Sequence, residues 1–152
     1  MSRAPPRTPR SAFARRLVAF RQRHPVFRRR RFLVGAEAGE LLWFTPAGTP
    51  VTADEWRDPA ARSLALYLDG ADAPDLAADG SPMVDDDFLL LVNAWWEPLT
   101  FTIPQTRPGQ TWCREIDTFD PAAIRGEGRS GVADPVVVGP RSVVVLRGTP
   151  GR

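Results

Sequence analysis

The first periodic stretch of the chain, residues 11–23, has apolar side chains at helical spacing. Phe13, Leu17 and Phe20 recur at i, i+4 and i+7, and arginines occupy much of the rest of the stretch. The helix has to end before Pro25, because proline disfavours the helical conformation of the residue that precedes it. The pattern therefore predicts one amphipathic helix that packs through its apolar stripe.

From residue 40 onward, short apolar or alternating runs replace the helical period, and turns rich in glycine and proline separate them. They predict six or seven strands, at 40–46, 63–69, 88–93, 99–103, 111–117, 136–139 and 142–147. Strands of this length at short, irregular spacing predict an antiparallel β-sandwich. The expected fold class is mainly β, with one N-terminal helix.

Alternation within single strands predicts which side chains share a face. In the strand at 63–69 three leucines alternate, which predicts a half-buried strand: Leu64, Leu66 and Leu68. Trp112 and Ile116 are predicted to share one side of the strand at 111–117. The strand at 88–93, FLLLVN, is apolar on both faces and is predicted to be central.

The five residues AWWEP, 94–98, separate two predicted strands at hairpin length. The strands at 88–93 and 99–103 are therefore predicted to pair with each other. Consecutive strand residues point to opposite faces, so Trp95 and Trp96 are not expected to form one flat surface. We expect one of them to pack on the sandwich and the other to lie near its rim.

Two further segments have local signatures. Thr52 and Glu55 match a capping box, which predicts one helical turn anchored by Trp56. The aspartate-rich segment 70–87 lacks the spacing of a calcium-binding loop, so it is predicted to be a solvated loop. The adjacent aspartates at 85–87 are not expected to form an acid/base pair.

Charge is distributed unevenly along the chain. Residues 1–31 hold eleven arginines and no acidic residue, whereas residues 32–152 carry a net charge of −9. The chain has no lysine, which we attribute to a GC-rich genome rather than to phosphate chemistry. The basic run at 26–31 leaves three interpretations open: phosphate binding to a nucleic acid, a solvated turn, or a surface for an acidic neighbour. We favour the turn, and nucleic acid is not expected as a partner.

Few residues suggest catalysis. A single cysteine excludes an intrachain disulfide and fits a reducing compartment, so we expect a cytoplasmic protein. No apolar run reaches the ~20 residues of a membrane span. Cys113 is expected to be a buried structural thiol, and His24 a residue at the helix end. We expect no catalytic residue, no cofactor and no metal site.

Nearly the whole chain, from about Phe13 to Arg147, resembles the C-terminal end of bacterial glycogen debranching enzymes. These are isoamylase-type members of glycoside hydrolase family 13, in the α-amylase superfamily, and the chain is most similar to their actinobacterial branch. The resemblance rests on four segments: HPVFRRRRF (24–32), the stretch from WFTPAGTP to LALYLDG (43–70), DDDFLLLVNAWWEPLTFTIP (85–104) and GPRSVVVLR (139–147).

The resemblance implies how the chain is divided. Enzymes of this family hydrolyse α-1,6-glucosidic branch points, with catalytic residues on an upstream (β/α)8 barrel that a C-terminal β-sandwich follows. By this analogy, residues 11–39 resemble the last barrel helix with a basic turn, and residues 40–147 resemble the sandwich. We expect residues 1–10 to be a disordered start and residues 148–152 a flexible tail.

No segment matches the family's catalytic motifs, so no catalytic residue is carried over. The resemblance implies a non-catalytic β-domain fragment that supports a barrel absent from this chain, with glycogen or another α-glucan as a partner. Without the barrel, we expect the helix to be poorly docked or to drive self-association. The alternative is a free-standing carbohydrate-binding module in which Trp43, Trp95 or Trp96 stacks on glucose.

Overall fold

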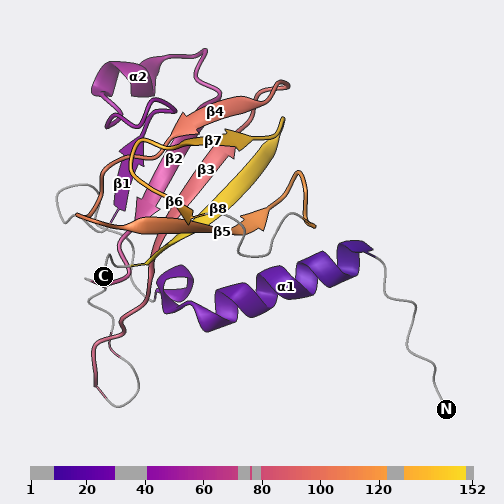
Figure 1. Ribbon diagram of the computed structural model, residues 1–152, viewed down its shortest axis with the longest axis vertical. Coiled ribbons are helices and arrows are strands. Elements are labelled where there is room, and N and C mark those ends of the chain that lie inside the picture. Colours follow the sequence, from indigo (N-terminus) through magenta and orange to yellow (C-terminus); the bar gives the residue numbers. More distant parts are fainter. Residues whose placement is uncertain (1–8, 30–40, 72–75, 77–79, 123–128, 150–152) are drawn as a thin grey trace.

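The computed structural model describes residues 9–29, 41–71, 76, 80–122 and 129–149 (Figure 1). Its elements are α1 (Pro9–Arg23), the 3-10 helix η1 (Pro25–Arg28), β1 (Leu41–Phe44), α2 (Ala53–Arg57), β2 (Ser63–Leu68), β3 (Asp87–Asn93), β4 (Leu99–Thr102), β5 (Thr111–Asp117), β6 (Arg129–Ser130), β7 (Pro135–Val138) and β8 (Ser142–Thr149). A six-stranded sheet has the order β1-β2-β3-β8-β5-β6, and a two-stranded sheet pairs β4 with β7. Every strand pair is antiparallel, so the mainly β architecture is confirmed.

Regular structure extends slightly beyond the predicted ends. Helix α1 begins at Pro9, inside the segment expected to be disordered, because proline fits the first helical turn. Strand β8 runs to Thr149, inside the expected tail. The remainder of the start and of the tail, and the basic turn from residue 30, lie outside the described residues. No helix of the described ranges is long and apolar enough to cross a bilayer.

The main core lies between the two sheets. The small sheet contributes the buried Phe101, Val136 and Val138, which pack against Leu89 and Leu91 of β3 in the large sheet. Strand β3 pairs with β2 on one side and β8 on the other, so the prediction that it is central is confirmed.

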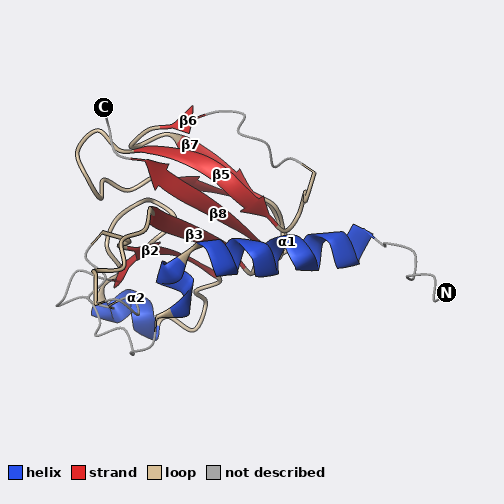
Figure 2. Cartoon of the chain, turned by 90° about the horizontal axis from the view of Figure 1, so that it is seen from below, coloured by secondary structure: helices blue, strands red, loops and turns tan. Residues whose placement is uncertain are grey.

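A second core lies on the opposite face of the large sheet, under α1 (Figure 2). Phe20 is 5% exposed and meets Phe88 edge-to-face, with 5.5 Å between ring centroids. Phe13 and Leu17 pack at the margin of the same cluster. The expectation of a poorly docked helix is therefore wrong, because the outward face of the sheet is itself apolar and receives the stripe. Self-association stays a prediction.

Two strand predictions are wrong, for different reasons: β2 is not half-buried, and Trp112 and Ile116 of β5 do not share a face. In β2, Ala65 and Tyr67 enter the main core, while the leucine face turns toward α1, so both faces of this strand are covered. In β5, Trp112 enters the main core but Ile116 joins the second core. A register shift at Glu115 in the pairing of β5 with β8 reverses the alternation between them.

The predicted hairpin between the strands at 88–93 and 99–103 is also wrong. Strands β3 and β4 belong to different sheets, and residues 94–98 cross from one sheet to the other. The buried Asn93 holds this crossing: its Nδ2 donates to the Glu97 carbonyl at 2.8 Å and to the Gly139 carbonyl at 3.0 Å. Its Oδ1 accepts the Trp95 N–H at 3.0 Å.

Helix α2 has the predicted capping box. The Glu55 N–H donates to Thr52 Oγ1 at 3.3 Å, and the Thr52 N–H donates to Glu55 Oε2 at 2.8 Å. Trp56, however, does not anchor this turn in the core. Its side chain is 53% exposed, because the five-residue helix lies on the outside of the sandwich.

The second core predicts how α1 contributes to stability. Phe20→Ala should lower the free energy of unfolding by about 3 kcal/mol, because it leaves a cavity against Phe88. Val18→Ala, on the 56% exposed side of the helix, is the matched control and should change it by less than about 0.5 kcal/mol. Urea unfolding gives both values. Equal unfolding midpoints for the two variants would contradict the docking of α1.

Candidate functional site

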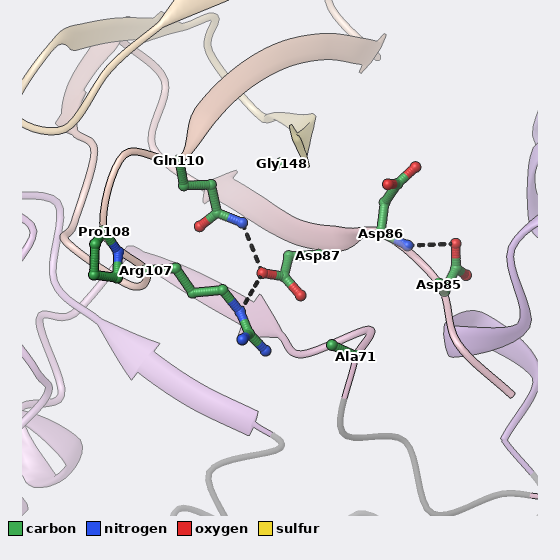
Figure 3. A pocket seen from close by; sticks show the side chains of 8 residues that line it. All are labelled: Ala71, Asp85, Asp86, Asp87, Arg107, Pro108, Gln110 and Gly148. Atoms are coloured by element: carbon green, nitrogen blue, oxygen red, sulfur yellow. Dashed lines mark hydrogen bonds and ion pairs between the residues drawn. The ribbon is translucent and has the colours of Figure 1, made fainter. Parts of the chain in front are cut away.

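A buried polar cluster surrounds Asp87, the first residue of β3 (Figure 3). Its Oδ2 accepts hydrogen bonds from Arg107 Nε at 2.8 Å and Gln110 Nε2 at 2.6 Å. The Tyr67 hydroxyl donates to the same oxygen at 2.9 Å, and the Gly70 N–H donates to Oδ1 at 2.9 Å. The carboxylate thus receives four donors from two segments of the chain, residues 67–70 and 107–110.

The cluster borders a hollow of about 230 Å³. Its lining residues are Ala71, Asp85, Asp86, Asp87, Arg107, Pro108, Gln110 and Gly148. Arg107 also forms an ion pair through Nη2 with Asp69 Oδ2 at 2.5 Å, so its guanidinium joins two carboxylates. Gly148 leaves room for Gln110, since a Cβ there would lie 2.5 Å from Gln110 Nε2.

Burial raises the pKa of Tyr67 above its ordinary value of 10.0. The nearby charges of Asp87 and Asp69 raise this pKa further, against the hydrogen bond from Arg107. The hydroxyl therefore stays protonated and remains a donor to Asp87. The two oxygens of Asp87 already accept four hydrogen bonds, so this carboxylate is poorly placed to accept a proton from a substrate. A buried polar cluster with its hydrogen bonds satisfied in this way is typical of a structural role.

A second polar contact joins the end of α1 to the start of β3. His24 Nδ1 lies 2.8 Å from Asp85 Oδ1, and the Val26 N–H donates to Asp85 Oδ2 at 3.1 Å. The imidazole also packs against the rings of Phe20 and Phe88, with centroids 4.7 and 4.8 Å away. His24 is therefore a tether between helix and sheet, beyond its predicted place at the helix end.

These contacts correct the prediction of a solvated acidic loop for residues 85–87, whereas residues 72–75 and 77–79 of that segment lie outside the described residues. The Asp85 side chain is 7% exposed, and Asp87 is 5% exposed. Asp86 is half-buried and pairs with Arg147 at 3.1 Å. Their partners lie far away in the sequence, so composition could not reveal them. The three carboxylates bind different groups: His24 for Asp85, Arg147 for Asp86 and Arg107 for Asp87.

Among the described residues, His24, Asp85 and Asp86 bring ligand atoms within 4.8 Å of one another, a grouping that could hold a metal ion. The sequence did not suggest it, because 61 residues separate His24 from Asp85. Protein partners already account for these atoms. Asp85 Oδ1 accepts both the His24 ring and the Asp86 N–H, and Asp86 Oδ2 faces Arg147.

The predicted carbohydrate contacts separate into two places. Trp95 and Trp96 stack on each other, with centroids 3.7 Å apart and an angle of 25° between the rings. Opposite faces were expected, but the two residues lie in a bend beyond β3, where strand alternation no longer applies. Trp96 is 60% exposed, as expected for a ring near the rim, and Trp95 is half-buried; packing of Trp95 on the sandwich stays a prediction.

Trp43 lies on β1 and has a different neighbour. Its ring stands at 83° to that of Trp56, with 5.3 Å between centroids. Trp56 was not predicted as a carbohydrate contact, because its capping-box helix suggested an anchoring role. Cys113 lies in β5 as predicted, but it is half-buried instead of buried.

Comparison with known proteins identifies the family. The family model described as "Isoamylase, C-terminal" matches residues 40–147, which is most of the chain. The chain belongs to the isoamylase C-terminal family. The resemblance to debranching enzymes is thereby confirmed.

Named relatives of this isoamylase C-terminal domain are much longer than the chain. The "Glycogen operon protein GlgX homolog" of Mycobacterium tuberculosis is 38% identical over 146 residues, which cover 91% of this chain and 20% of that protein. The "Isoamylase" of Pseudomonas amyloderamosa is 32% identical over 108 residues, covering 71% of this chain and 12% of that protein. The chain therefore spans a fifth or less of these relatives.

A solved structure supports the fold. The chain matches a type I pullulanase from Bacillus subtilis, crystallised with maltose, at a TM-score of 0.51 and 18% identity. The match covers 90% of this chain and 15% of the pullulanase. At this identity the match bears on the fold alone. The fold of this chain is thus similar to that of a small part of the pullulanase chain.

The buried tyrosine predicts an alkaline pH dependence in this isoamylase C-terminal domain. The raised pKa of Tyr67 gives stability that is fully present below pH 10, and it is lost as the pH rises through the folded-state value. Tyr67 is the single tyrosine and there is no lysine, so few other groups titrate there. Urea unfolding from about pH 8 to about pH 11 should show the decline.

Tyr67→Phe is the matched variant. It should lower the free energy of unfolding by about 1 kcal/mol at neutral pH, through the lost hydrogen bond to Asp87. It should also lack the alkaline decline. The same decline in both proteins would show that another group causes it.

Proposed function

We propose that this chain is the C-terminal β-domain of a glycogen-debranching enzyme and that it supports a catalytic barrel lying outside these 152 residues. The proposed activity of the assembled enzyme is hydrolysis of α-1,6-glucosidic branch linkages. Family membership and the small share of each relative that the chain covers support this proposal. The names of those relatives support glycogen or a related α-glucan as the substrate, and a cytoplasmic location belongs to the same proposal.

The observation that carries the proposal is the way α1 is used. One side of the helix is buried on the large sheet, through Phe20 and its neighbours. The other side is exposed, with Val18 56% accessible among arginines and alanines. A helix docked in this way can join two bodies, with the sandwich on one side and a further domain on the other. We assign its outward side to the barrel.

The polar cluster of this domain supports a non-catalytic role. The carboxylate of Asp87 is saturated with donors, and Asp85 is used to tether α1. The division into a helical segment at 11–39 and a sandwich at 40–147 is part of the proposal. In this view, the second core under α1 is the junction between them.

The test is reconstitution. The chain alone should release no linear maltooligosaccharides from glycogen. Mixed with the upstream part of the M. tuberculosis relative, produced without its matching fifth, it should form a complex on size exclusion and restore debranching. Measurable debranching by the purified chain alone would contradict the proposed role.

A matched pair of variants locates the interface. Val18→Arg places a charge at the centre of the proposed docking surface and should weaken the complex about tenfold or more. Val137→Arg changes an equally exposed valine, 57% accessible on β7 of the small sheet, and should bind as the unaltered chain does. Isothermal titration gives both affinities. Equal affinities would exclude α1 as the docking helix.

A further inference from the structure

Trp56 borders a surface hollow that is separate from the polar cluster around Asp87. The hollow has a volume of about 220 Å³ and lies beside α2. Its apolar wall includes Trp56 and Val51, and its polar wall includes Glu55, Asp58 and Arg62. A second hollow of about 340 Å³ shares Trp56 and adds Trp43. An exposed indole thus stands between two concave surfaces.

The indole is held in position even though half of it is exposed. The capping box of Thr52 and Glu55 fixes the turn that carries it. Trp43 meets it edge-to-face at 5.3 Å and limits its rotation. A large side chain that is both exposed and fixed loses little conformational entropy when a ligand covers it.

The polar wall is also prearranged. Glu55 Oε2 accepts the N–H and the hydroxyl of Thr52 at 2.8 and 2.9 Å. These bonds lower the pKa of Glu55, so its carboxylate stays ionised and accepts hydrogen bonds at neutral pH. Arg62 Nη1 donates to the carbonyls of Pro59 and Ala61 at 2.7 and 3.2 Å, which orients the guanidinium.

A flat apolar ring beside fixed acceptors and donors suits a ligand with one apolar face and a rim of hydroxyls, which is the chemistry of a pyranose. We propose that Trp56, with the hollow lined by Glu55, Asp58 and Arg62, binds a glucose unit of an α-glucan. The indole stacks on the ring's C–H face, and the carboxylates accept from its hydroxyls. The choice of α-glucan among sugars rests on the proposed function.

The location agrees with such a role. Helices α1 and α2 lie on opposite sides of the strands (Figure 1). A barrel docked on the outward side of α1 would leave Trp56 open to solvent. The same domain could then bind an outer chain of the glucan while the barrel acts on a branch point.

Glycogen binding by the full chain tests the proposal. In native gels that contain glycogen, the chain should be retarded, and maltoheptaose should relieve the retardation while β-linked cellohexaose should not. Trp56→Ala should weaken binding of maltoheptaose about tenfold or more, through the lost stacking surface. Phe119→Ala is the matched control: Phe119 is 60% exposed but lines neither hollow, and its loss should leave binding unchanged.

Three outcomes would contradict glucan binding at Trp56. No retardation of the unaltered chain, equal binding by Trp56→Ala, or equal loss in both variants would each remove the assignment to this hollow. Urea unfolding midpoints confirm that the variants are folded. Measuring complex formation with the barrel, beside glucan binding, distinguishes a failure of this site from a failure of the proposed function. A complex that forms without any glucan binding overturns the site alone, whereas Trp56-dependent glucan binding without a complex overturns the supporting role alone.

Discussion

Strand β3 carries apolar side chains on both faces, and the arrangement of the whole molecule follows from the need to cover both. Leu89 and Leu91 point into the sandwich, whereas Phe88 and Leu90 point away from it. Each large side chain removed from water contributes about 1.5–3 kcal/mol, so leaving either face open would be costly. The small sheet covers the inward face, and α1 covers the outward face. The helix is therefore part of the core structure of this chain.

The ends of β3 close that core with polar groups. Alternation places Asp87 and Asn93 on the same inward face as the leucines, one at each end of the strand. Asp87 receives donors from the loops that follow β2 and β4. Asn93 bonds to the carbonyls of Glu97 and Gly139, where the chain changes sheets. Both side chains are buried and hydrogen-bonded. They therefore fix the arrangement of the loops without the free-energy penalty of burying an unpaired polar group.

Local signals in the sequence were sufficient where the deciding contacts are local. The capping box of α2 and the end of α1 before Pro25 both depend on residues a few positions apart. The central place of β3 was indicated by its own apolar residues, although its pairing partners β2 and β8 are distant in the sequence. The antiparallel sandwich also followed from strand length and spacing. The family resemblance supplied the basis for the proposed function, which these patterns could not, since we found no residue pattern that indicates a reaction.

Distant contacts decided the features that the sequence did not reveal. The segment at 94–98 has hairpin length, but the side chain of Asn93 ties it to Val138 and Gly139 at the end of β7, so the strands on either side separate. One extra residue, Glu115, reverses the alternation of β5. Among the candidate carbohydrate contacts, residue type identified Trp43, Trp95 and Trp96. It did not single out Trp56, because exposure and a neighbouring hollow are properties of the folded surface.

The two proposed surfaces differ in their physics as well as in their place. On the outward side of α1, arginines lie around the exposed Val18. Residues 1–31, which include this helix, hold eleven arginines and no acidic residue. Charge of this kind steers and selects a partner of opposite sign, while the apolar centre contributes most of the affinity. A glucan is neutral, so long-range charge gives it no guidance, and its binding depends on stacking and on hydrogen bonds at short range. Salt screens the first interaction far more than the second. A domain that uses both can hold its barrel through one surface and its polymer through the other, and neither surface competes with the other.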